Sequence, residues 1–155
     1  MKIFDLIRKF YTQRLMLFPR VFLMRFFGTM VGKGVKLYAA PKVIGFYSKI
    51  CIGDYAVLNE GVVLNSRGKI RIGRKTHLSS FCKIYTGQLD LNNRSVHKES
   101  DVIIGNNVWI GSAAIILGGV EICDNTVIAA GSVVTKSIDK SGLYAGVPAK
   151  YIRGL

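Results

Sequence analysis

The sequence predicts an all-β protein, a β-helix built from hexapeptide repeats, preceded by an amphipathic helical segment and interrupted by one protruding loop. Three observations lead to this prediction. An aliphatic residue returns every six positions, the period stops once between residues 85 and 101, and the first residues follow a helical period instead. A length of 155 residues with 50% hydrophobic composition fits one domain with a sizeable core. We therefore divide the chain into a helical segment, 1–31, and a β-helix domain, 32–155.

The N-terminal segment, residues 2–27, is predicted to be helical in two pieces. Pro19 is expected to end or kink the first piece near Phe18, because proline disrupts a helix interior. Apolar residues recur at steps of three or four, the period of one helix face: Phe4, Ile7, Tyr11, Leu15, Phe18 and Phe22. Basic residues occupy other positions. The segment suits either the interface of an anionic membrane or a helix packed on the domain or on a partner subunit.

The six-residue repeat runs through most of the remaining chain. Its second half has an aliphatic residue at every sixth position: Ile104, Ile110, Ile116, Ile122, Ile128 and Val134. A small or β-branched residue follows four positions later: Val108, Ala114, Val120, Thr126 and Ser132. The first half has the same period, with a slip of two residues in the middle: Ile52, Leu58, Leu64, Ile72, Leu78 and Ile84. We expect the aliphatic residues to fill the coil interior, the small residues to fit where the chain bends, and Asn and Gly to serve the turns.

The interruption at residues 85–101 has no apolar period. A scaffold made only of repeats would not need it, so we expect a loop expelled from the coil. Long loops in compact domains are often functional.

Charge and cysteine content narrow the function further. A net charge of +13 is compatible with a solvated basic surface or with an anionic partner such as nucleic acid, a membrane surface or a phosphorylated ligand. We expect no nucleic acid, because the repeat shows no surface that combines aromatic and basic residues. The three cysteines lack C-x-x-C spacing, and two histidines are too few for the three-histidine zinc site of a carbonic anhydrase. We therefore expect no metal.

The run IIGNNVWIGSAAIILGGVEICDNTVIAAGSVVTKSI, followed by YAGVPAKYIR, closely resembles bacterial hexapeptide acyltransferases, nearest to the sugar and polysaccharide O-acetyltransferases. The resemblance covers residues 34–153 in pattern and 102–153 in detail. It implies a left-handed parallel β-helix with three faces and a homotrimer. It also implies an acyl-CoA donor, bound in the groove between neighbouring subunits.

Positions that match the family's motifs imply a cofactor site. Backbone contacts with the pantetheine arm of acetyl-CoA match Gly111, Ser112 and Ala130. Contacts at the nucleotide end match Thr135 and Lys136, and a lysine beside a phosphate is chemically sensible as a point charge.

The acceptor side is expected to involve the loop and the chain's only tryptophan. Asn92 fits the family's loop motif and is assigned to acceptor binding. Trp109 is assigned to the same pocket, where its flat apolar face suits a sugar ring; the alternative is a structural side chain at the subunit contact.

The family's catalytic histidine is missing from its usual place. The loop of such enzymes commonly begins like T-G-S-H-D-x-N-S, with the histidine as the general base that deprotonates the acceptor hydroxyl. Here the position holds Leu89, which cannot move a proton. His97 from the same loop, with Asp90 or Glu99 to orient it, is one replacement, and His77 on the preceding coil is another. In the third alternative no residue replaces the base, and transfer is slow or absent.

The residues and the resemblance together predict an acetyl-CoA-dependent O-acetyltransferase acting on a sugar hydroxyl of a cell-surface polysaccharide or its precursor. An N-acetyltransferase of an amino sugar and a weakly catalytic or non-catalytic membrane-associated repeat protein are the alternatives. No secretory signal and no apolar run near the roughly 20 residues of a membrane span is evident. We expect a bacterial cytoplasmic protein, peripheral at the inner membrane face.

Overall fold

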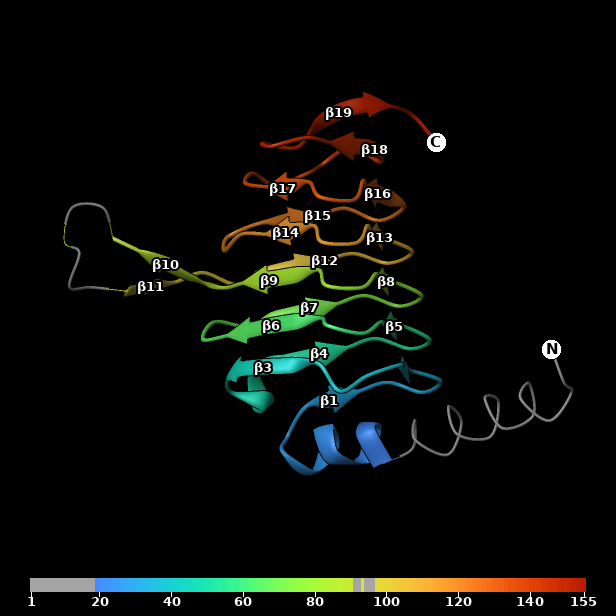
Figure 1. The fold of residues 1–155 in the computed structure, drawn as a ribbon, viewed down its shortest axis with the longest axis vertical. Coiled ribbons are helices and arrows are strands. Elements are labelled where there is room, and N and C mark those ends of the chain that lie inside the picture. Colours follow the sequence, from blue (N-terminus) through green and yellow to red (C-terminus); the bar gives the residue numbers. More distant parts are fainter. Residues whose placement is uncertain (1–18, 91–92, 94–96) are drawn as a thin grey trace, which may run out of the picture.

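The computed structural model describes residues 19–90, 93 and 97–155, and these form a stack of coils with three flat sides (Figure 1). Each coil gives one short strand to each of three parallel sheets, here called faces A, B and C. Face A contains β1 (Met30–Val31), β4 (Ile50–Ile52), β7 (Ile70–Ile72), β12 (Val102–Ile104) and β15 (Glu121–Ile122). Face B contains β2 (Lys36–Leu37), β5 (Val57–Leu58), β8 (His77–Leu78), β13 (Trp109–Ile110), β16 (Thr126–Ile128) and β18 (Gly142–Ala145), with β19 (Lys150–Arg153) added antiparallel. Face C contains β3 (Lys42–Gly45), β6 (Val63–Ser66), β9 (Lys83–Tyr85), β14 (Ile115–Ile116) and β17 (Val133–Val134). The prediction of an all-β, left-handed parallel β-helix is confirmed.

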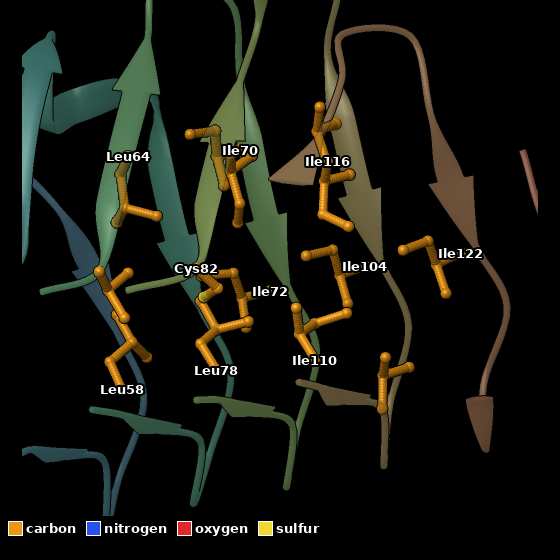
Figure 2. Close-up of a cluster of buried hydrophobic side chains, with 14 of the residues drawn as sticks. Leu58, Leu64, Ile70, Ile72, Leu78, Cys82, Ile104, Ile110, Ile116 and Ile122 are labelled. Carbon is orange, nitrogen blue, oxygen red and sulfur yellow. The ribbon is translucent and has the colours of Figure 1, made fainter. Parts of the chain in front are cut away.

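Each six-residue repeat forms one face of a coil, so that three repeats complete one coil. Parallel pairing places Leu58 beside Leu78 and Leu78 beside Ile110, so that equivalent residues of successive coils form a column inside the solenoid. Figure 2 shows these columns, which fill the interior from side to side. All the predicted aliphatic positions are at most 2% exposed, and the small residues between them are buried as well. The hexad positions therefore form one continuous core.

The corners between faces require left-handed backbone. One residue with positive φ stands at each A–B corner from β1 to β16, namely Gly34, Tyr55, Lys75, Asn107 and Asn125, and at each B–C corner from β5 to β17, namely Gly61, Phe81, Ala113 and Gly131. Asn and Gly were expected at such turns, whereas tyrosine, phenylalanine and alanine are costly there. The parallel pairing on both sides of a corner fixes the backbone and outweighs that cost.

A short helix, residues 19–26, covers the N-terminal end of the solenoid (Figure 1). Met24 points into the core and is 4% exposed. Arg20 and Arg25 donate hydrogen bonds to carbonyl oxygens of the first coil, including those of Leu37 and Val31. These carbonyls lie at the end of the stack, where no further coil exists to bond them.

The helix accounts for part of the predicted N-terminal segment, and residues 2–18 lie outside the described residues. Within the described ranges, no helix is long and apolar enough to cross a membrane. The division at residues 31 and 32 stays a prediction.

The predicted interruption leaves the stack between β9 and β12, and it projects from the corner between faces C and A (Figure 1). Its described residues are not a structureless loop. They form a two-stranded antiparallel ribbon of β10 (Gly87–Leu89) and β11 (His97–Glu99). Both sides of the ribbon lie away from the core, so its sequence shows no apolar alternation that would have predicted strands.

The coil is constrained by close contact between successive coils and by left-handed backbone at its corners. Gly73 and Gly131 allow these two constraints to be tested separately. A Cβ at Gly73 would lie 2.2 Å from the carbonyl oxygen of Gly105 on the next coil, whereas a Cβ at Gly131 would meet nothing within 4 Å, although its φ is +68°. We expect Gly73→Ala to lower the free energy of unfolding by about 3 kcal/mol, because the coils must separate. Gly131→Ala should cost only about 1 kcal/mol. Denaturant unfolding of both variants measures the two values, and an equal loss would contradict the role given to close coil contact.

Candidate active site

The base of the ribbon is held by Thr86, which is fully buried. Its hydroxyl donates to the carbonyl of Asn65 at 2.7 Å and accepts from the backbone N–H of Gly68 at 2.8 Å. Its carbonyl accepts from the N–H of Ser100 at 2.8 Å, which closes the ribbon. The threonine of the loop motif therefore fixes where the ribbon leaves the solenoid.

The ribbon register places Leu89 directly opposite His97. Directly opposed residues of an antiparallel pair project to the same side, with Cβ atoms about 5 Å apart. The side chain of His97 therefore leaves the ribbon on the side from which the side chain at position 89 leaves it. Glu99, two residues further along β11, projects to this side too, and its carboxylate lies 3.1 Å from the ammonium of Lys49.

The other side of the ribbon carries Gln88 and Lys98, which are also paired in register. The ammonium of Lys98 lies 2.9 Å from the carboxylate of Asp90. Gln88 donates to the carbonyl of Gly118 on the following coil. Within one chain the structure therefore does not bring Asp90 and His97 together.

The predicted pantetheine contacts are stacked at one corner of the solenoid, between faces B and C. Gly111 lies so close to the next coil that an added Cβ would be 2.4 Å from the backbone nitrogen of Ala130. Ser112 accepts a hydrogen bond at its carbonyl from the N–H of Gly131, at 2.8 Å. Ser112 and Ala130 are both exposed, so their backbone and small side chains line an open edge.

The predicted nucleotide contacts, Thr135 and Lys136, follow β17 at the corner between faces C and A, and both are exposed. The ribbon leaves from this same corner, on an earlier coil. The corner that carries Ser112 and Ala130 is at the opposite edge of face C. Asn92 lies outside the described residues. Among the residues that the structure describes, no three His, Cys, Asp or Glu side chains gather as metal ligands.

Trp109 lies on the outer surface of face B and is 51% exposed. Parallel pairing of β8 with β13 places it beside His77, and the two rings stack with centroids 4.9 Å apart. Partial burial lowers the pKa of His77 below its ordinary value of 6.5, and the charge of Lys36 lowers it further. This stack was not expected from the sequence; the signal for it is the equivalent hexad position of the two residues.

Residues 101–136 match the family of bacterial transferase hexapeptide proteins (six repeats). The chain is 34% identical over 137 residues to a putative colanic acid biosynthesis acetyltransferase, WcaF, of Escherichia coli K12, covering 86% of this chain and 74% of that protein. The chain belongs to the hexapeptide-repeat acetyltransferases.

Solved structures of other acetyltransferases share the fold. A maltose O-acetyltransferase from Clostridium difficile 630 is 33% identical, with a TM-score of 0.80 over 85% of this chain and 72% of that one. A hexapeptide-repeat acetyltransferase from Vibrio cholerae O1 biovar eltor, solved with acetyl coenzyme A, is 28% identical, with a TM-score of 0.81 over 88% and 76% of the two chains. The family resemblance predicted from the sequence is confirmed.

The stacked histidine of this acetyltransferase makes stability depend on pH. Because the pKa of His77 is lowered in the folded state, the unfolded chain takes up the proton first on acidification. The stability that neutral His77 contributes is therefore present above the unfolded value of 6.5 and is lost as the pH falls toward the folded value. We expect the melting temperature of wild type to fall more than that of His77→Gln between about pH 7.5 and about pH 5. Thermal unfolding checks this, and a constant difference between the two proteins would contradict it.

Proposed function

We propose that this protein transfers an acetyl group from acetyl-CoA to a hydroxyl of a sugar, within a cell-surface polysaccharide or its precursor. The colanic acid and maltose relatives support a sugar acceptor, and the Vibrio cholerae structure supports the donor. The positions that match the family's donor motif include Ser112 and Ala130 at one corner of the solenoid and Thr135 and Lys136 at another, and all four are exposed. The corner of Ser112 and Ala130 is suited to backbone contacts with an extended pantetheine arm.

The proposed mechanism depends on the register of the ribbon. A histidine at position 89 is the family's base, and His97 projects from the opposite strand to the same side as Leu89. We infer that the base is on the opposite strand of the ribbon, at His97 instead of position 89, and that it projects to the same side. The neutral imidazole of His97 takes the proton of the acceptor hydroxyl, and the oxygen attacks the thioester carbon. As the C–S bond breaks, the imidazolium returns the proton to the sulfur of CoA.

The positions of the residues assigned to donor binding are consistent with the side of the ribbon to which His97 projects. The nucleotide contacts Thr135 and Lys136 lie on a later coil than Ser112, so the arm would run toward the N-terminal coils. His97 shares its side of the ribbon with Glu99, which reaches back to Lys49 near the first coil. The base thus faces the part of the solenoid beyond the end of the arm, where an acceptor has room to bind.

Two carboxylates of the loop, Asp90 and Glu99, are the candidates for orienting the base. Asp90 is paired with Lys98 on the other side of the ribbon, so its contribution is to hold the ribbon rather than to contact His97 in the same chain. Glu99 projects to the side of His97 and is the nearer candidate for orienting it.

A homotrimer completes the proposed site. The ribbon leaves the corner between faces C and A, whereas Ser112 and Ala130 lie across face C at the corner between faces B and C. A ring of three copies would place the ribbon of one subunit beside the donor corner of its neighbour. Trp109 and His77, on face B near that corner, would then face the acceptor. We also propose a cytoplasmic location at the inner membrane face.

Exchange of the two ribbon positions tests the base. We expect His97→Ala to reduce acceptor-dependent thiol release from acetyl-CoA at least about 100-fold, the usual contribution of a general base. The double variant Leu89→His, His97→Ala should release thiol at least about tenfold faster than His97→Ala, because the two positions project to the same side. Maltose, galactosides and surface-glycan fragments serve as acceptors.

His77→Gln removes the other histidine and should keep its turnover number, because a residue that only lines the acceptor side affects the KM for the acceptor and not proton transfer. Loss of turnover in His77→Gln, with His97→Ala unchanged, would assign the base to His77. Full activity in both single variants would mean transfer by proximity alone. An absence of acceptor-dependent release, with acetyl-CoA still bound, would favour the non-catalytic alternative.

Lys136 tests the nucleotide end of the donor site. Loss of one charge-assisted contact with a phosphate costs about 1.5–3 kcal/mol. We therefore expect Lys136→Ala to raise the KM for acetyl-CoA by about tenfold or more, with a small change in kcat. Lys140→Ala removes an exposed lysine from the same region and should leave KM unchanged. Equal effects of the two substitutions would indicate only a loss of net charge.

A further inference from the structure

We propose that the N-terminal end of the β-helix is a docking face for an anionic membrane, with the solenoid axis directed away from the bilayer. This inference deepens the proposed membrane location, and it depends on described residues at one end of the stack.

The apolar part of this face belongs to the helix that caps the stack and to the turn that follows it. Met24 plugs the core, whereas Phe22, Leu23, Phe26 and Phe27 point outward and are 61%, 48%, 73% and 50% exposed. We call these four side chains the aromatic end. Their aromatic rings form a chain, with centroids 6.4 Å apart for Phe22 and Phe26 and 5.5 Å apart for Phe26 and Phe27. Three exposed phenylalanine rings therefore form a contiguous apolar patch on one end, and such a patch on a folded protein marks an interaction surface.

The chain of rings continues onto the first coil. Phe27 lies 5.2 Å from Tyr47, centroid to centroid. The neighbouring Phe46 is 56% exposed, and the ammonium of Lys49 lies 5.0 Å from its ring. Aromatic rings with adjacent cations are the composition that binds at the headgroup level of a bilayer.

Charge is distributed unequally along the solenoid, and the positive end is the aromatic end. Residues 19–53 contain six basic residues and no acidic residue: Arg20, Arg25, Lys33, Lys36, Lys42 and Lys49. Residues 121–155, at the opposite end, contain four basic and three acidic residues, Lys136, Lys140, Lys150, Arg153, Glu121, Asp124 and Asp139. An anionic surface therefore attracts one end of the molecule and orients it.

The same charge argues against a second copy as the occupant. Two copies joined through their aromatic ends would oppose cations to cations, because within the described residues only Lys49 of the six has an acidic ion-pair partner, Glu99. An anionic bilayer both accepts the rings and neutralises the cations. In the proposed trimer, three parallel copies would present three such ends to the same surface, which strengthens weak individual contacts.

Docking of this end on a membrane would determine from which side the acceptor enters the active site. Lys49, at the docking end, contacts Glu99 on the side of the ribbon that carries His97. The base therefore faces the membrane. The favoured acceptor is a sugar attached to a membrane lipid, and this step alone rests on the proposed function.

Vesicle flotation of the full chain tests the docking face. We expect the protein to float with phosphatidylcholine vesicles that contain about 30% phosphatidylglycerol, weakly with phosphatidylcholine alone, and less at high salt. The double variant Phe22→Ser and Phe26→Ser should reduce the bound fraction about tenfold. Phe81→Ser removes a phenylalanine that is 58% exposed on a distant corner, and it should bind like wild type.

Three results would overturn the proposal: no binding to the anionic vesicles, equal binding to both vesicle types at all salt concentrations, or full binding of the double variant. A particle of twice the trimer mass that the double variant dissociates would place a second copy on this face instead. Acetyl-CoA binding and thermal unfolding of the double variant should match wild type, which excludes misfolding. Its unchanged activity on a soluble sugar would separate docking from the proposed reaction.

Discussion

The structure depends on backbone hydrogen bonding between successive coils. Strands of two to four residues are too short to persist alone, so each exists only because a strand one coil away pairs with it. The N–H of Gly53 donates to Ile72, that of Gly73 to Ile104, and that of Gly105 to Ile122, all at 2.7–2.8 Å. This repeated register determines which side chains form the core, where the backbone turns left-handed, and why Ser112 and Ala130 share one edge.

The same register explains why the sequence predicts the scaffold so well. A parallel stack requires equivalent residues at equivalent positions, and the interior column through Leu58, Leu78 and Ile110 is therefore visible as a period in the sequence. The corner residues are less visible, because Tyr55 and Phe81 adopt positive φ through pairing on both sides rather than through their own preference. The stack of His77 on Trp109 also follows from register, but only once the strands are known to pair.

The ribbon was predicted as a protrusion and not as a pair of strands, because it packs against no core and carries no hydrophobic signature. Its register is the information that the sequence lacks. Without the pairing of Leu89 with His97, a histidine eight residues away from Leu89, the position that the resemblance assigns to the base, is only one of two histidines in the chain. The pairing also separates Asp90 from His97, although the two residues are close in sequence. Thus the scaffold follows from composition and period, whereas the proposed assignment of the base depends on one short antiparallel pairing.

The two ends of the solenoid have a consequence for solubility. A stack of identical parallel coils has no intrinsic length, and an uncovered last coil presents unpaired backbone groups on which another chain could continue the stack. Arg20 and Arg25 occupy carbonyls at one end, and at the other the antiparallel β19 reverses the chain direction. A fibre built end to end would need parallel partners at both surfaces. The covered ends therefore disfavour end-to-end growth of a fold whose repeat has no intrinsic length.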